Sequence, residues 1–104
     1  MSDFGVQVRG AAVRFERLVL ALDGSGDVVE VREELDDVYQ MSGLWRGPGS
    51  GTVEYVGCEV LIAGGGPTIW LRTRDRVFVG SWGSEMVEVP ASEAVCGYYD
   101  GFFE

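Results

Sequence analysis

The sequence predicts a single α+β domain over residues 1–104, in which an antiparallel meander of five to six strands carries one or two short helices. Short β-rich segments follow one another through tight turns. Glycine, at 16 of 104 residues, is about twice as frequent as usual and marks most of those turns. The last residues carry an apolar stripe at helical spacing. A small all-β barrel is the alternative fold.

The N-terminal half is expected to begin with a β-hairpin. Residues 14–22 are rich in Val and Leu, which favours a strand. Residues 23–27 consist of Asp, Gly and Ser, a composition typical of a tight turn, and residues 28–31 resume the β-rich pattern. We therefore expect two antiparallel strands joined by a loop of about five residues.

A short helix is expected next, over residues 33–42. Val31, Leu35 and Val38 fall at the i, i+4, i+7 spacing of one helix face. Gly43 stands where a glycine commonly follows the end of a helix. The acidic residues in the first turns suit the positive end of the helix dipole.

The C-terminal half predicts the rest of the sheet. Four β-rich segments follow one another at residues 52–63, 68–73, 76–82 and 85–89. Gly57 predicts a bulge or bend in the first of these segments. The last segment alternates apolar and charged side chains, as a half-buried strand does.

The tail predicts a helix. Ser92 is a suitable N-cap residue. The apolar side chains that follow fall at i, i+3, i+4, i+7 and i+8: Val95, Tyr98, Tyr99, Phe102 and Phe103.

Net charge is the strongest functional signal. The chain has 17 acidic residues against 8 arginines, with no lysine and no histidine, and its formal net charge is −9. Such a surface repels DNA, RNA and anionic membranes and attracts basic protein surfaces. The acidity is also compatible with a role in solubility, or with adaptation to high salt, which would spread the acidic residues over the whole surface. The N-terminus lacks a secretory signal and no segment is long enough to span a bilayer, so we expect a cytoplasmic protein.

The residue types argue against an enzyme. Without histidine or lysine, the chain lacks the usual general base near neutral pH and the amine of Schiff-base chemistry. Cys58 and Cys96 have no histidine partner and lack the spacing of a zinc site. No catalytic, metal-binding or cofactor-binding residue is therefore predicted. We expect both cysteine thiols to be buried, and the sequence leaves open whether a disulfide bond joins them.

The first group of candidate partner-binding residues is acidic and comes from two segments. Asp27, Glu30, Glu33, Glu34, Asp36 and Asp37 belong to one, and Glu85 and Glu88 to the other. If the two segments lie together, their carboxylates form an anionic face that imitates a row of phosphates and occupies a basic groove. The alternative is a solvated charged surface.

The second group of candidates is aromatic: Trp45, Tyr98, Tyr99, Phe102 and Phe103. Interfaces favour Tyr, Trp and Phe as anchors, whereas an aromatic stripe on a helix is more often part of a core. Trp45 is expected in a loop.

Three arginines, Arg72, Arg74 and Arg76, alternate through an expected hairpin turn. The acidic field of the whole chain argues against nucleic-acid binding by this row. We expect these arginines to pair with acidic residues of the same chain.

These features predict a small acidic, non-enzymatic inhibitor that binds a basic nucleic-acid-handling surface in the cytoplasm of a bacterial host. The profile is typical of phage-encoded anti-defence proteins, including anti-CRISPR proteins and DNA mimics that occlude a DNA-binding channel. One alternative is an immunity protein that neutralises a basic nuclease toxin. Another is a structural or assembly subunit of a phage or bacterial complex. Neither nucleic-acid nor membrane binding is expected, and a homodimer is left open.

Overall fold

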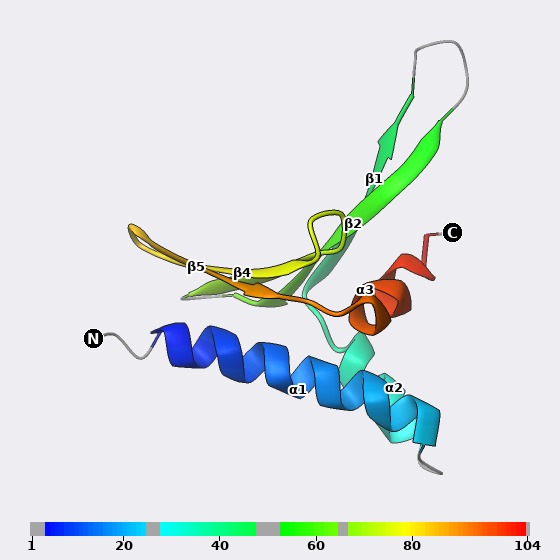
Figure 1. Cartoon of the computed structure of the whole chain (residues 1–104), viewed down its shortest axis with the longest axis horizontal. Coiled ribbons are helices and arrows are strands. Elements are labelled where there is room, and N and C mark those ends of the chain that lie inside the picture. The colour runs from blue at the N-terminus through cyan, green and yellow to red at the C-terminus, as the bar shows by residue number, and fades with distance from the viewer. Residues whose placement is uncertain (1–3, 25–27, 48–52, 65–66, 104) are drawn as a thin grey trace.

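The computed structural model describes residues 4–24, 28–47, 53–64 and 67–103. Within these residues the chain forms two helices, a run of strands and a last helix (Figure 1). The helices are α1 (Phe4–Gly24), α2 (Val28–Asp36) and α3 (Glu93–Asp100). The strands are β1 (Gln40–Arg46), β2 (Glu54–Ala63), β3 (Thr68–Arg72), β4 (Val77–Trp82) and β5 (Glu85–Pro90).

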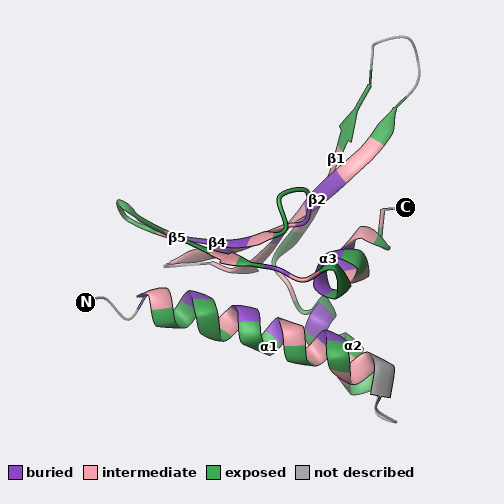
Figure 2. Cartoon of the chain, in the orientation of Figure 1, coloured by how far each residue is buried: buried purple, intermediate pink, exposed green. Residues whose placement is uncertain are grey.

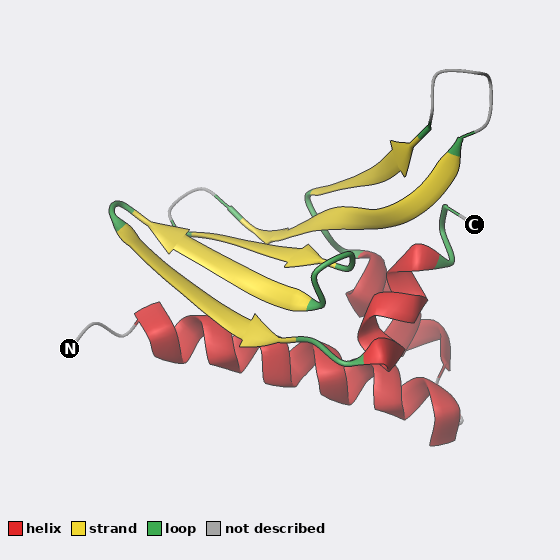
Figure 3. Ribbon diagram, turned by 45° about the horizontal axis from the view of Figure 1, so that its top comes forward, coloured by secondary structure: helices red, strands yellow, loops and turns green. Residues whose placement is uncertain are grey.

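The strands form one antiparallel sheet in the order β1-β2-β3-β4-β5, so each strand pairs with its neighbours in the sequence. The sheet is open, with β1 and β5 as its edges. The helices lie on one face of the sheet, and the β1–β2 hairpin projects beyond them (Figure 1, Figure 3). The predicted α+β class with a meander is confirmed, and the barrel alternative is wrong.

The predicted N-terminal hairpin is wrong, because residues 14–22 belong to α1 and residues 28–31 begin α2. The apolar pattern begins well before residue 14 and keeps helical spacing along α1. Its buried members, called here the buried stripe, are Phe4, Val8, Ala12, Phe15 and Val19. Successive members of the buried stripe are four, four, three and four residues apart, which places them on one face of a helix. A strand would instead bury every second residue. Burial of the whole stripe outweighs the β propensity of its Val and Leu residues.

The helix predicted over residues 33–42 is partly wrong. α2 begins earlier and ends at Asp36, and residues 40–42 already belong to β1. Gly43 therefore lies within a strand and ends no helix. The apolar spacing was misleading because Val38 packs against the core from the short connection between α2 and β1, and not from a helix.

The strands predicted in the C-terminal half are confirmed, and the predicted tail helix is confirmed in part, because α3 ends at Asp100 and leaves Phe102 and Phe103 beyond it. β2, β3, β4 and β5 begin and end within two residues of the predicted strands. Gly57 lies at a register shift between β1 and β2, and its φ of 153° is a conformation open to glycine. Ser92 caps α3 by accepting a hydrogen bond from the backbone N–H of Val95.

The core lies between the sheet and the helices. The largest fully buried side chains come from all three helices and from the central strands: Val8, Leu35, Cys58, Val60, Leu71, Phe78, Val95 and Tyr99. Figure 2 shows that the buried positions of α1 face the sheet while its outer side is exposed. α2 packs against α1, and α3 packs against both α1 and β2. The position of α2 is therefore set through α1.

α1 approaches the sheet most closely at Gly80 in β4. A Cβ atom added at Gly80 would overlap Cγ2 of Val8 and would stand 2.9 Å from Cζ of Phe4. Glycine is required here by the close approach of the helix, since any side chain would push α1 away from the sheet.

We expect Gly80→Ala to lower the free energy of unfolding by about 1–3 kcal/mol, because the added methyl group overpacks the contact between α1 and β4. Gly97→Ala in α3 is the matched control, since a Cβ atom there meets no other atom within 4 Å. This control should gain up to about 1 kcal/mol from helix propensity. Urea unfolding of both variants measures the difference, and an unchanged midpoint for Gly80→Ala would contradict the close contact.

Candidate protein-binding surfaces

The outer side of α2 is the most acidic surface that the structure describes. Its carboxylates, called here the acidic face, line one shallow hollow: Glu30, Glu33, Glu34, Asp36 and Asp37. Residues 28–37 hold these five acids and one arginine, a net charge of −4. The other 94 residues of the chain hold twelve acids and seven arginines, a net charge of −5. The density of negative charge is therefore highest on this one element.

The packing of α2 explains why these carboxylates face solvent. Leu35 is fully buried and Val31 packs against the same core, which fixes the apolar side of the helix toward α1. The opposite side carries the acids around Val29, which is exposed. A helix of nine residues with one apolar side has no other way to bury its hydrophobic area.

The distribution of charge along α2 does not favour the stability of the helix. Its last turn contains Glu33, Glu34 and Asp36 and no basic residue. Acidic side chains at the C-terminal end of a helix oppose the helix dipole, at a cost of about 0.3–1 kcal/mol each. Helix stability therefore does not explain these acids.

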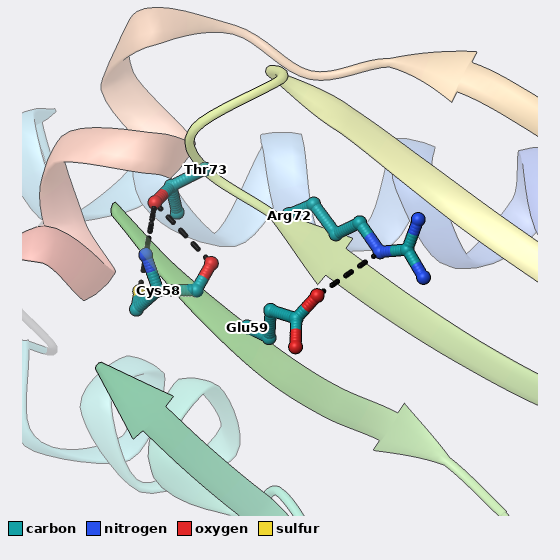
Figure 4. A network of polar contacts seen from close by, with 4 residues as sticks. All are labelled: Cys58, Glu59, Arg72 and Thr73. Carbon is teal, nitrogen blue, oxygen red and sulfur yellow. Dashed lines mark hydrogen bonds and ion pairs between the residues drawn. The ribbon is translucent and has the colours of Figure 1, made fainter. Parts of the chain in front are cut away.

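Ion pairs in the described part of the chain lie elsewhere. Arg46 pairs with Glu54, Arg72 with Glu59 and Arg76 with Glu93, at 3.4, 3.2 and 3.1 Å. Figure 4 shows the Arg72–Glu59 pair across β2 and β3. Intramolecular pairing, predicted for the arginine row, is confirmed for Arg72 and Arg76. None of these pairs includes a residue of the acidic face.

The two acidic segments of the sequence do not lie together. Glu85 and Glu88 are in β5, whose first residues lie near the N-terminal end of α1 (Figure 1, Figure 3). α2 packs at the opposite end of α1, and a 21-residue helix is about 30 Å long. Asp27 lies outside the described residues. The expectation that Glu85 and Glu88 extend the acidic face is therefore wrong.

The aromatic candidates form two clusters near the end of the chain. Tyr98 and Phe102 meet edge to face, with ring centroids 5.6 Å apart. Trp45 meets Tyr55 and Phe103 in the same way, at 5.7 and 5.9 Å. Trp45 belongs to β1 and not to a loop as predicted. Phe102 is 49% exposed and Trp45 is 52% exposed, so each cluster presents one ring to solvent.

Tyr99 is the exception among the aromatic candidates, because it is fully buried. Its ring packs near Phe15 of α1, and its hydroxyl donates a 2.6 Å hydrogen bond to the backbone carbonyl of Leu35. This contact ties α3 to the end of α2. Tyr99 is therefore a core residue, and its prediction as a partner-binding residue is wrong.

The acidic face and the first aromatic cluster adjoin each other. The hydroxyl of Tyr98 donates a 2.6 Å hydrogen bond to Oδ1 of Asp36. Partial burial, together with this bond to a carboxylate, raises the pKa of Tyr98 to about 12. A hollow of about 300 Å³ lies at the junction, lined by Arg32, Asp36, Tyr98, Gly101 and Phe102. The carboxylate of Asp36, the side chain of Arg32 and the exposed ring of Phe102 thus adjoin one another on one surface.

A partly buried polar network joins the end of α3 to the sheet, and sequence reasoning missed it. Oδ1 of Asp100 accepts hydrogen bonds from the hydroxyls of Tyr55 and Thr73, at 2.6 and 2.8 Å. The hydroxyl of Thr73 in turn accepts a hydrogen bond from the backbone N–H of Cys58, with 2.7 Å between Oγ1 and N, as Figure 4 shows. Burial raises the pKa of both Tyr55 and Cys58. These groups therefore remain protonated near neutral pH and hold the end of α3 to β2.

Comparison with protein-family models, with curated protein sequences and with solved structures finds no match for this chain. No group of three or more potential metal ligands occurs among the described residues. No helix in the described ranges is long and apolar enough to cross a membrane.

We expect Thr73→Val to lower the free energy of unfolding by about 1–3 kcal/mol. The substitution keeps the shape of the side chain but leaves a buried N–H and a carboxylate oxygen without this partner. Thr68→Val, the same change at a half-buried position of β3, should stay within about 0.5 kcal/mol of the wild type. Equal midpoints for the two variants in urea would argue against a stabilising network.

Both cysteine thiols are free and buried. Burial raises the pKa of Cys96 to about 11 and also raises that of Cys58. Because the thiolate is the reactive form, a raised pKa lowers the reactive fraction at a pH near 8. We expect neither thiol of the native protein to react with a disulfide reagent within minutes, and both to react after unfolding. Rapid reaction in the native state would contradict their burial.

Proposed function

We propose that this protein is a non-enzymatic inhibitor that binds a basic protein surface through the acidic face of α2. The partner surface is one that handles nucleic acid, and the bound carboxylates occupy positions where phosphates would otherwise lie. Phosphate contacts supply most of the non-specific affinity of such surfaces, so a rigid set of carboxylates competes without reading any sequence.

The observation that carries this proposal is the concentration of acids on one short helix and the residue that follows it. Glu30, Glu33 and Glu34 of α2 stand at i, i+3 and i+4, so the Cβ atoms of Glu33 and Glu34 lie about 5–6 Å from that of Glu30. Placing like charges this close destabilises the free protein. A cationic partner removes that repulsion, and the relief adds to the free energy of binding.

The exposed ring of Phe102 supports the same surface. It lies at the junction with Asp36 and Tyr98, where an arginine of the partner could stack on an aromatic ring and pair with a carboxylate. Interfaces draw much of their affinity from aromatic anchors of this kind, while peripheral charges mainly raise the association rate.

Reversal of charge on α2 tests the proposal. The double variant Glu33→Lys with Glu34→Lys should bind the partner at least about tenfold more weakly, roughly 1.4 kcal/mol. Glu85→Lys with Glu88→Lys makes the same change in net charge on β5 and should bind normally. Immobilised wild-type and variant proteins are exposed to a bacterial lysate that contains CRISPR machinery, and bound proteins are identified by mass spectrometry after washes at low and high salt.

The two variants separate a local surface from a general field. Retention of a nucleic-acid-binding complex by the wild type and the β5 variant, but not by the α2 variant, supports the proposal. Equal loss in both variants means that net charge alone attracts the partner. Equal retention by both would falsify the role of the acidic face.

A further inference from the structure

The two edges of the sheet differ in their protection against pairing with another chain. β5 carries Glu85, Glu88 and Pro90, and charged residues and proline are devices by which edge strands avoid such pairing. β1 has no acid and no proline, and its one charged residue, Arg46, stands at its end. The register shift at Gly57 places the extra residue on β2, so β1 itself continues without a bulge. The free side of β1, called here the open edge, is therefore regular and unprotected.

The pairing of β2 shows which backbone groups the open edge presents. The backbone C=O of Cys58 accepts a hydrogen bond from the N–H of Thr73 at 3.0 Å, so it points toward β3 and away from β1. Cys58 lies opposite Gly43, and this pair therefore exchanges no backbone hydrogen bonds. Because these directions alternate along a strand, the N–H and C=O groups of Met41, Gly43 and Trp45 point away from β2. Among the described strands none pairs on that side, where Figure 3 shows β1 at the margin of the sheet.

The side chain of Trp45 offers an added strand an apolar contact. Its ring packs against Tyr55 and Phe103 and is still 52% exposed. Directly opposite side chains on paired strands lie about 4.5–5.5 Å apart at Cβ, so the ring is within reach of a strand at the open edge. Backbone pairing combined with such side-chain contacts is the way in which sheet edges bind extended peptides.

Charge identifies the kind of segment that fits the open edge. Asp37 of the acidic face stands three residues before Gln40, a distance of at most about 10 Å along the chain. The other end of β1 carries Arg46. The open edge thus runs from an acidic end to a basic end, which favours a segment with its positive charges beside Gln40. A second copy is disfavoured, because each chain carries a net charge of −9.

We propose that the open edge binds an extended segment of a partner protein, which pairs antiparallel with β1 and carries lysine or arginine at its C-terminal end. Antiparallel pairs are the commoner kind, and in this orientation the C-terminal end of the added strand lies beside Gln40. The inference rests on the proposed function for the positive charge of the partner alone. The backbone pairing follows from the open edge itself.

Amide hydrogen exchange, followed by NMR at each residue, tests the pairing. The probe is a capped peptide of eight residues, six alternating valines and threonines followed by two lysines. In the free protein the amides of Met41, Gly43 and Trp45 should exchange faster than those of Ser42 and Leu44, which face β2. Saturation with the peptide should slow exchange at the first three at least about tenfold and change the other two little. Unchanged exchange at the first three overturns the proposal.

Two control peptides separate strand pairing from attraction by charge. Methylation of all six valine and threonine nitrogens keeps the charge but removes the backbone donors, so this peptide should give no protection. Equal protection by the methylated peptide overturns backbone pairing. A peptide with its two lysines at the N-terminal end should bind more weakly, and equal affinity overturns the stated orientation. Protection that rises with protein concentration without any peptide means that a second copy occupies the open edge, and also overturns the proposal.

A matched pair of variants tests the same edge from the side of the protein. Trp45→Pro removes a backbone N–H that points away from β2, a position at which an edge strand tolerates proline. Trp45→Ala loses the same ring but keeps this donor. The proline variant should bind the lysine peptide at least about tenfold more weakly than the alanine variant, as measured by NMR titration. Equal affinity of the two variants contradicts pairing at this residue.

The peptide experiment can fail or succeed independently of the proposed function. Glu33→Lys with Glu34→Lys should weaken peptide binding through charge but keep the alternating protection at saturation. Protection by the peptide without capture of a nucleic-acid-binding complex overturns the inhibitor function and retains the strand-binding edge. Capture of such a complex through the acidic face without protection by the peptide does the reverse.

Discussion

The packing of α1 across β4 and β5 is the contact on which the rest of the structure depends. It buries the stripe from Phe4 to Val19, and it requires Gly80 in β4 because Val8 lies directly over that position. α2 is held against α1, and α3 lies between α1 and β2. The helices cover one face of the open five-stranded sheet, and the long helix α1 covers β4 and β5. The acidic face is therefore positioned through α1, while the hydrogen bonds from Tyr98 and Tyr99 hold the end of α2 to α3.

The C-terminal half of the fold could be predicted because its signals are local. The alternation in β5, the turn before it and the cap at Ser92 each depend on residues close in sequence. The N-terminal half could not be predicted in this way, because a short segment rich in Val and Leu is compatible with either a strand or a helix. Only the full length of the buried stripe separates the two, and a window that begins at residue 14 omits its first three members.

The candidate site was predictable in its composition and not in its geometry. A count of charges along the sequence locates the acids of α2, but it also suggests Glu85 and Glu88, which the fold places at the far end of α1. Tyr98 and Asp36 are 62 positions apart, and their hydrogen bond depends on the packing of α3 beside α2. The network around Asp100 joins residues up to 45 positions apart. Contacts of this range follow from tertiary packing, which no local pattern contains.

The position of the excess charge bears on why the chain is acidic. Solubility or adaptation to high salt would be served by acids spread over the surface. The 94 residues outside 28–37 hold twelve acids and seven arginines, a net charge of −5, and several of these charges are paired. The ten residues 28–37 alone carry a net charge of −4, and three of these acids oppose the dipole of the helix that carries them. This density of acids on one solvent-facing helix, at a cost in helix stability, is the feature from which we propose a cationic partner.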